Sequence, residues 1–277
     1  MPTKLDALFR ADDNGGFRLY LLHEPTQGPI QSALVFVHGW AEEMNKCRHV
    51  VAAMARALAD EGWATLLVDL RGCGDSSGEF GDADWNGWID DVLRGAAWLH
   101  ERHASAPLWL GGMRAGALLA VQAAGRLPQT PNLLFVQPVL QGRQHLQQFL
   151  RLADAARWAG AEAGAGSSEL RAMLAAGQSI DVAGYRIAPA LAEGLASASL
   201  QAPAAMSPGH VCWIDTAPRA PAEPAPAHVT QAARWRSEGW TVTHEVVVAP
   251  PFWQTTEIEH APALPPAVAR QLARPAA

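Results

Sequence analysis

The 277-residue chain has no basic excess, no long apolar run and few cysteines. Its 21 Lys and Arg residues against 27 Asp and Glu residues give a formal net charge of −6, which disfavours binding along a nucleic-acid backbone. No apolar run approaches the roughly 18 residues that a membrane-spanning helix needs, so we expect no membrane span. Acids stand close behind the first residue with no apolar stretch, so we expect no secretory signal.

The cysteines are too few and too scattered for a disulfide framework or a metal site. They are Cys47, Cys73 and Cys212. Their odd number and wide spacing predict reduced thiols in a cytoplasmic protein without a metal or a cofactor. Hydrophobic residues make up 49% of the chain and charged residues 17%, which predicts a folded protein with a buried core. Most of the 11 Trp residues are expected to fill that core, and some to line a pocket.

Buried strands and helices alternate along most of the chain. An N-terminal hairpin is expected around Asn14-Gly15-Gly16, a strong turn signal. Six apolar runs then predict strands at 33–38, 64–69, 108–112, 132–137, 210–215 and 241–248. Helical spacing predicts helices at 46–60, 88–102, 115–126, 228–238 and 264–272. This alternation predicts an α/β protein with a mostly parallel, doubly wound sheet.

The alternation stops at about Leu140 and resumes near Val211. Between these points the sequence predicts helices at 145–158, 169–176 and 188–198, joined by segments rich in Gly, Ala and Ser. We therefore predict a helical cap segment (residues 141–205) inserted into a core formed by residues 1–140 and 206–277. The cap segment is expected to lie over the carboxyl ends of the parallel strands, where α/β proteins bind ligands.

Three motifs follow the predicted strands. They are His38-Gly39-Trp40, Asp69-Leu70-Arg71-Gly72-Cys73-Gly74-Asp75-Ser76 and Gly112-Met113-Arg114-Ala115-Gly116. With the order of elements, they resemble the α/β-hydrolase fold over nearly the whole chain. In that fold the third motif is a nucleophile elbow, Gly-x-Ser-x-Gly, whose glycines permit a sharp strand-to-helix turn. The resemblance implies that the backbone amides of Trp40 and Ala115 form an oxyanion hole.

Arg114 stands where that pattern has its serine. A guanidinium stays protonated and cannot act as an acyl-accepting nucleophile in water. At the start of a helix it would instead bind an anionic small molecule, a carboxylate or a phosphate. Two alternatives remain open: a replaced side chain in an inactive site, and a guanidinium neutralised by Glu42, Glu43 or Glu257.

The other catalytic positions also depart from the hydrolase pattern. Trp253 stands about where the base is expected, and His260 is a candidate base with a surface position as its alternative. Asp215 ends the preceding strand and is the candidate acid, with a loop-capping role as its alternative. The other residues expected to line the pocket are His38, Gly39, Glu42 and Gln137.

Several longer blocks give a finer resemblance. They are residues 38–48, the Gly-x-Arg-x-Gly elbow, Gln137-Pro138-Val139, Gln148-Phe149-Leu150-Arg151 and residues 251–258. Together they resemble the exosortase A system-associated hydrolase type 2 family. The resemblance implies an α/β-hydrolase associated with a bacterial export and exopolysaccharide system, in which arginine at the elbow is a family trait.

Three functions follow as hypotheses. The first is a hydrolase of ester or acyl type, with Glu43, Asp69 or Glu257 as a general base on water and Arg114 stabilising the anion. The second is a non-catalytic protein that binds an anionic or sugar-derived small molecule in the same pocket. The third is a scaffold that binds a protein partner through the cap segment. An open pocket beside Arg114 favours the first two, and a buried ion pair without a cavity favours the third.

Overall fold

The computed structural model describes residues 2–12, 15–158, 165–204, 206–255 and 257–273. Asn14 of the predicted turn and Thr256 of the C-terminal sequence block lie outside the described residues. The strands are β1 (Thr3–Ala11), β2 (Phe17–Pro25), β3 (Ser32–Val37), β4 (Trp63–Val68), β5 (Leu108–Met113), β6 (Asn132–Val136), β7 (Ile180–Val182), β8 (Tyr185–Ile187), β9 (His210–Ala217) and β10 (Thr241–Val248). The helices are α1 (Glu42–Asp60), α2 (Trp85–Arg102), α3 (Gly116–Ala124), α4 (Gly142–Trp158), α5 (Ser167–Ala175), α6 (Pro189–Ser197), α7 (Pro226–Ser237) and α8 (Leu264–Leu272), with a short 3-10 turn at Phe80–Asp82.

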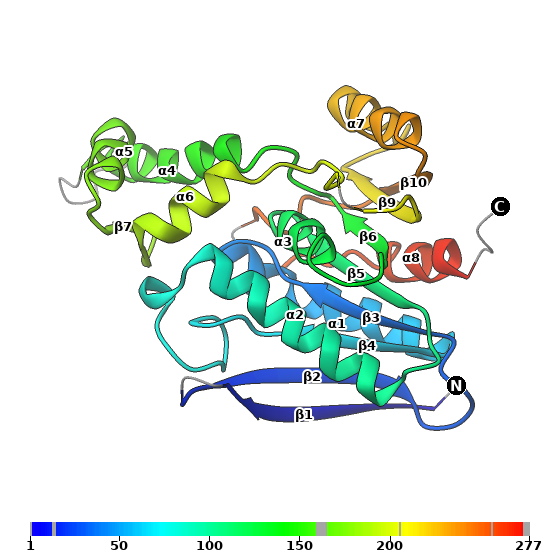
Figure 1. Ribbon diagram of the computed structural model, residues 1–277. Helices are drawn as coiled ribbons and strands as arrows, with labels where there is room; N and C mark the ends of the chain where they lie inside the picture. The colour runs from blue at the N-terminus through cyan, green and yellow to red at the C-terminus, as the bar shows by residue number, and fades with distance from the viewer. Residues whose placement is uncertain (1, 13–14, 159–164, 205, 256, 274–277) are drawn as a thin grey trace.

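Eight strands form one sheet in the order β1-β2-β4-β3-β5-β6-β9-β10 (Figure 1). The hairpin β1–β2 is antiparallel and joins β4 antiparallel, and every later pairing is parallel. β3 and β4 are buried at every position, as expected for strands covered on both faces. The predicted hairpin, the six predicted parallel strands and the α/β-hydrolase fold are therefore confirmed.

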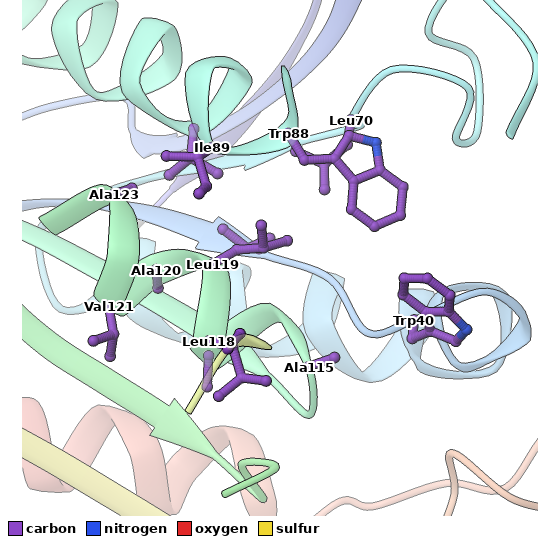
Figure 2. Packing of buried hydrophobic residues seen from close by; sticks show 14 of the residues in the cluster. Trp40, Leu70, Trp88, Ile89, Ala115, Leu118, Leu119, Ala120, Val121 and Ala123 are labelled. Atoms are coloured by element: carbon purple, nitrogen blue, oxygen red, sulfur yellow. The ribbon is translucent and has the colours of Figure 1, made fainter. Parts of the chain in front are cut away.

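Helices cover both faces of the sheet and divide the core into two layers. α1 and α8 pack together on one face, where Met54 of α1 and Phe36 of β3 belong to one buried apolar cluster. α2, α3 and α7 cover the other face. Figure 2 shows Leu119 of α3 facing Ile89 of α2 in this second layer, with Trp88 nearby. No described helix is long and apolar enough to cross a membrane.

The cap segment contains α4, α5 and α6, which gather on one side of the molecule, away from α7 and α8 (Figure 1). It also contains the small antiparallel hairpin β7–β8, where the sequence predicts only helices and the segments that join them. Each of these strands has three residues, too few for an alternating pattern to stand out. Residues 159–164 and 205 of the cap segment lie outside the described residues.

α1 begins four residues earlier than predicted, at Glu42. Its first turn, Glu42 to Asn45, is mostly polar, so the apolar spacing used for the prediction starts only later. The earlier start has a consequence for the site, because it places Glu42 and Glu43 on a helix directly after the His38-Gly39-Trp40 loop.

Candidate functional site

A cavity of about 560 Å³ opens where β3 and β5 end and α4 passes over them. Trp40 follows β3, Arg114 follows β5, and His145 and Phe149 come from α4. The described residues that line it are Trp40, Glu42, Glu43, Lys46, Arg114, His145, Gln148, Phe149, Leu152, Trp253 and Gln254. α4 therefore lies over the carboxyl ends of β3 and β5, and the pocket lies at this edge of the sheet.

Arg114 occupies a sharp turn between β5 and α3. Its φ is +55°, in the left-handed region that a non-glycine residue rarely adopts. Its backbone nitrogen donates to the Val136 carbonyl at 3.2 Å, and its carbonyl accepts from Ala117. A side chain at Gly112 would collide with the backbone of Gly116, so the turn requires glycine there. The tight turn lifts the Arg114 side chain toward the cavity.

The Arg114 guanidinium is already ion-paired. Its Nε donates to Glu43 Oε1 at 3.0 Å, and Nη1 donates to the Gln137 carbonyl at 3.5 Å. The Trp253 ring stacks against it, with the guanidinium carbon 5.1 Å from the ring centroid. Of the three acids proposed to neutralise Arg114, the structure brings Glu43 to it. This contact weakens the hypothesis of an open anion site at Arg114.

The second oxygen of Glu43 reaches the loop before α1. Oε2 accepts from the Trp40 backbone nitrogen at 3.4 Å and lies 3.7 Å from His145 Nε2. Trp40 N is one of the two amides expected to form an oxyanion hole, so Glu43 fills half of that site. The other amide, Ala115 N, makes no hydrogen bond among the described residues.

Three buried side chains on the cavity wall have polar atoms without partners in the described structure. They are Trp40 Nε1, Trp253 Nε1 and both ring nitrogens of His145, in residues that are 2%, 6% and 6% exposed. Burial lowers the pKa of His145, although the Glu43 carboxylate opposes the shift. His145 is therefore neutral near pH 7.

The sequence did not identify two pocket residues of α4, His145 and Phe149. His145 and Phe149 are four residues apart and so share one face of that helix. Phe149 packs edge-on against Trp40, with ring centroids 6.0 Å apart. Helical spacing could have paired these two residues, but not placed them over the elbow.

The other predicted pocket residues surround the site without lining the cavity, apart from Glu42. Gly39 lies against Glu43 and the Arg114 side chain, so a side chain there would crowd both. His38 Nδ1 contacts the Gly39 carbonyl at 2.8 Å. The side chain of Gln137 turns to β9, where its Oε1 accepts from Thr216 N at 2.7 Å. The Glu42 carboxylate accepts from the Tyr185 hydroxyl at 2.8 Å, which joins α1 to the cap hairpin.

Asp215 belongs to a different network. Its Oδ1 accepts from His228 of α7 and its Oδ2 contacts His244 of β10, each at 2.8 Å, and Trp213 Nε1 donates to Oδ1 at 3.0 Å. Burial opposes ionisation, yet the hydrogen bonds from both histidines and Trp213 outweigh it and lower the Asp215 pKa to about 2. None of these residues lines the cavity. The sequence identified Asp215 but gave no signal for its two histidine partners.

The last two candidates, Glu257 and His260, are exposed and do not line the cavity. The His260 ring contacts His49, with centroids 5.0 Å apart. The three cysteines are buried, and burial raises the pKa of the Cys47 thiol, so they are poor nucleophiles. Among the residues that the structure describes, no group of three His, Cys, Asp or Glu side chains is arranged to hold a metal.

The sheet order, the strand-to-helix elbow and the covered strand ends define an α/β-hydrolase fold. Residues 28–171, more than half of the chain, match the family model described as serine aminopeptidase, S33. The chain belongs to this family.

Solved structures agree on the fold. Est1E from Butyrivibrio proteoclasticus, in a structure with ferulic acid bound, is 14% identical, with a TM-score of 0.65 over 97% of this chain and 100% of that one. An α/β serine hydrolase homologue from Coxiella burnetii is 17% identical, with a TM-score of 0.57 over 97% of each chain.

The biotin biosynthesis bifunctional protein BioHC of Teredinibacter turnerae is 34% identical over 109 residues. That match spans 39% of this chain and only 17% of BioHC.

Proposed function

We propose that this chain is an exosortase A system-associated hydrolase of type 2, in which Arg114 replaces the elbow nucleophile. The sequence blocks around the pocket support this assignment, since they supply Trp40, Glu43 and Trp253 as well as the elbow. We further propose a cytoplasmic protein in which the cap segment is an insertion between core regions 1–140 and 206–277.

In this proposal the cavity binds a small organic molecule of ester or acyl type and forms no covalent acyl-enzyme. The observation that carries it is the Arg114–Glu43 pair at the elbow, 3.0 Å from Nε to Oε1. Acyl transfer needs a nucleophilic side chain at that turn, with a base in hydrogen-bond reach. The described residues lining the cavity include no serine, threonine or cysteine.

The nearby serines have structural roles that support the same conclusion. Ser76 donates to the Asp69 carbonyl and accepts from Leu19 N at 2.9 Å, and it is buried. Ser77 bonds the Phe17 backbone at both its nitrogen and its carbonyl. Asp215, the candidate acid, has both oxygens engaged by histidines outside the cavity. The elbow therefore lacks the nucleophile of a catalytic triad, and Asp215 is not free to act as its acid.

A fluorophosphonate probe, which labels activated serines, tests the proposal. We expect no labelling of the wild-type protein at probe concentrations that label an authentic serine esterase completely. Arg114→Ser should also stay unlabelled and show no burst with an activated ester, because the described contacts of the elbow side chain include no hydrogen bond to a histidine. Stoichiometric labelling mapped to Ser76 or Ser77 would contradict the proposal.

A second function has one observation in its favour. His145 is neutral near pH 7 and its Nε2 lies 3.7 Å from Glu43 Oε2, so it could take a proton from a water molecule that attacks an ester. We propose this water-activated hydrolysis as the alternative. Turnover of a nitrophenyl ester in proportion to protein concentration, lost in His145→Asn and without probe labelling, would favour it over binding alone.

A further inference from the structure

The Glu43 carboxylate contacts the two groups beside the cavity that would bind an anionic ligand, one at the elbow and one in the loop after β3. One is the charged Arg114 Nε, at 3.0 Å, and the other is the Trp40 backbone amide, at 3.4 Å. Guanidinium groups and loop amides are the usual donors to carboxylates and phosphates. Because Glu43 is part of the chain, it reaches them without the loss of translational freedom that a free anion suffers on binding. A competing anion must displace it.

The charges around the cavity add to this exclusion. Arg114 and Lys46 carry positive charge, Glu42 and Glu43 carry negative charge, and His145 is neutral near pH 7. The charged side chains among the described lining residues therefore sum to no net positive charge that would attract an anion. An entering carboxylate would also lose its hydration beside two like charges.

The walls of the cavity suit an uncharged ligand. Trp40 and Trp253 line it with their aromatic rings. Phe149 and Leu152 complete the wall with apolar surface.

We propose that Glu43 is a built-in anionic ligand of the elbow, which makes the cavity select uncharged organic molecules over carboxylates and phosphates. This inference rests on the proposed function, because it assigns the ligand class of the same cavity. Glu43 is then the residue that determines charge specificity, and Arg114 is an internal partner of Glu43.

Matched pairs of compounds test the specificity. Benzamide and benzoate have the same ring with a neutral or an anionic head, and so have phenylacetamide and phenylacetate. Binding is followed by the shift in melting temperature and by tryptophan fluorescence, since Trp40 and Trp253 line the cavity. We expect the wild-type protein to respond at least ten-fold more strongly to the amide of each pair than to its acid.

Glu43→Ala provides the decisive measurement, because it opens the space that the carboxylate fills. We expect the variant to gain at least ten-fold in affinity for benzoate, and acetate to restore part of its lost melting temperature. The double variant Glu43→Ala/Arg114→Met should lose this gain. Lys46→Met in the Glu43→Ala background should keep it, which separates the elbow from the other cation in the cavity.

Glu43→Gln covers the case in which Glu43→Ala does not fold. It keeps the side-chain volume and removes the charge, so Arg114 should take up acetate that the wild-type protein ignores. Equal responses of the wild-type protein to acid and amide, or no gain of benzoate or acetate affinity in either variant, would overturn the inference. Fluorophosphonate labelling of the wild-type protein would instead overturn the proposed function, so the two failures are distinct.

Discussion

Arg114→Met tests whether the ion pair at the elbow is a structural contact. Methionine keeps an apolar stem beside Trp253 but leaves the Glu43 carboxylate without its guanidinium. Removing one partner of a buried ion pair costs about 3–5 kcal/mol. The side chains of Arg114 and Glu43 are 13% and 15% exposed, which places the cost near the lower end, at about 3 kcal/mol. At about 2–3 °C per kcal/mol for a chain of this size, the melting temperature should fall by roughly 6–9 °C.

A double-mutant cycle separates the pair from the packing of its stems. We expect Glu43→Gln to cost about 2 kcal/mol, since Arg114 keeps its contacts with the Gln137 carbonyl and Trp253. The double variant Glu43→Gln/Arg114→Met leaves neither charge unpaired. Its free energy of unfolding should therefore fall by about 3 kcal/mol, not by the roughly 5 kcal/mol expected for two independent changes. Urea denaturation followed by circular dichroism gives all four free energies of unfolding.

Arg126→Met is the matched control. Arg126 also pairs with a carboxylate, Asp90, at 3.4 Å, but these side chains are 43% and 50% exposed. Exposed pairs contribute up to about 1 kcal/mol, so this change should have a small effect. Additive costs in the double-mutant cycle, or an Arg114→Met variant as stable as Arg126→Met, would refute the reasoning.

Three further outcomes are expected. Gly112→Ala should destabilise the protein by about 3 kcal/mol, the upper range for overpacking, because its new carbon meets the Gly116 backbone; Gly209→Ala, with ordinary contacts, should cost far less in urea denaturation. Ionised Asp215 should contribute about 2 kcal/mol to the free energy of unfolding, because its pKa is about 2 in the folded protein. This contribution should be complete above about pH 5 and be lost as the pH falls toward 2. The free energy of unfolding of Asp215→Asn, measured at several pH values, should lack this dependence on pH. Iodoacetamide should leave Cys47 and the other cysteines unmodified in the native protein and alkylate them all in denaturant, as mass spectrometry would detect.

The fold was predictable from the sequence because the parallel strands are short, continuous apolar runs. Leu34 to Val37, for example, is buried at every position, and such a run needs only local information to be recognised. The start of α1 was missed because its first turn carries Glu42, Glu43 and Asn45, and no apolar period begins there. The β7–β8 hairpin was missed because strands of three residues carry almost no pattern.

The site could be predicted only in part. Trp40, Arg114 and Trp253 were chosen because each follows a strand at the same edge of the sheet, and parallel strands bring such residues together. The partner of Arg114 could not be chosen among three acids, because that choice depends on distances across the fold. His145 and the two histidines on Asp215 were missed for the same reason, since helix packing brings His145 and His228 to their partners and strand pairing brings His244 to Asp215.

The cap segment and the sheet share one continuous apolar core. Phe149 packs on Trp40, the Tyr185 ring packs on Phe80, and Leu195 belongs to the same buried cluster as the α2 and α3 side chains. Swinging the whole cap away would expose this apolar surface to water, at about 25 cal/mol per Å². Exchange of the proposed ligand should therefore proceed by rotamer changes of exposed lining side chains such as Leu152, with the cap segment kept in place.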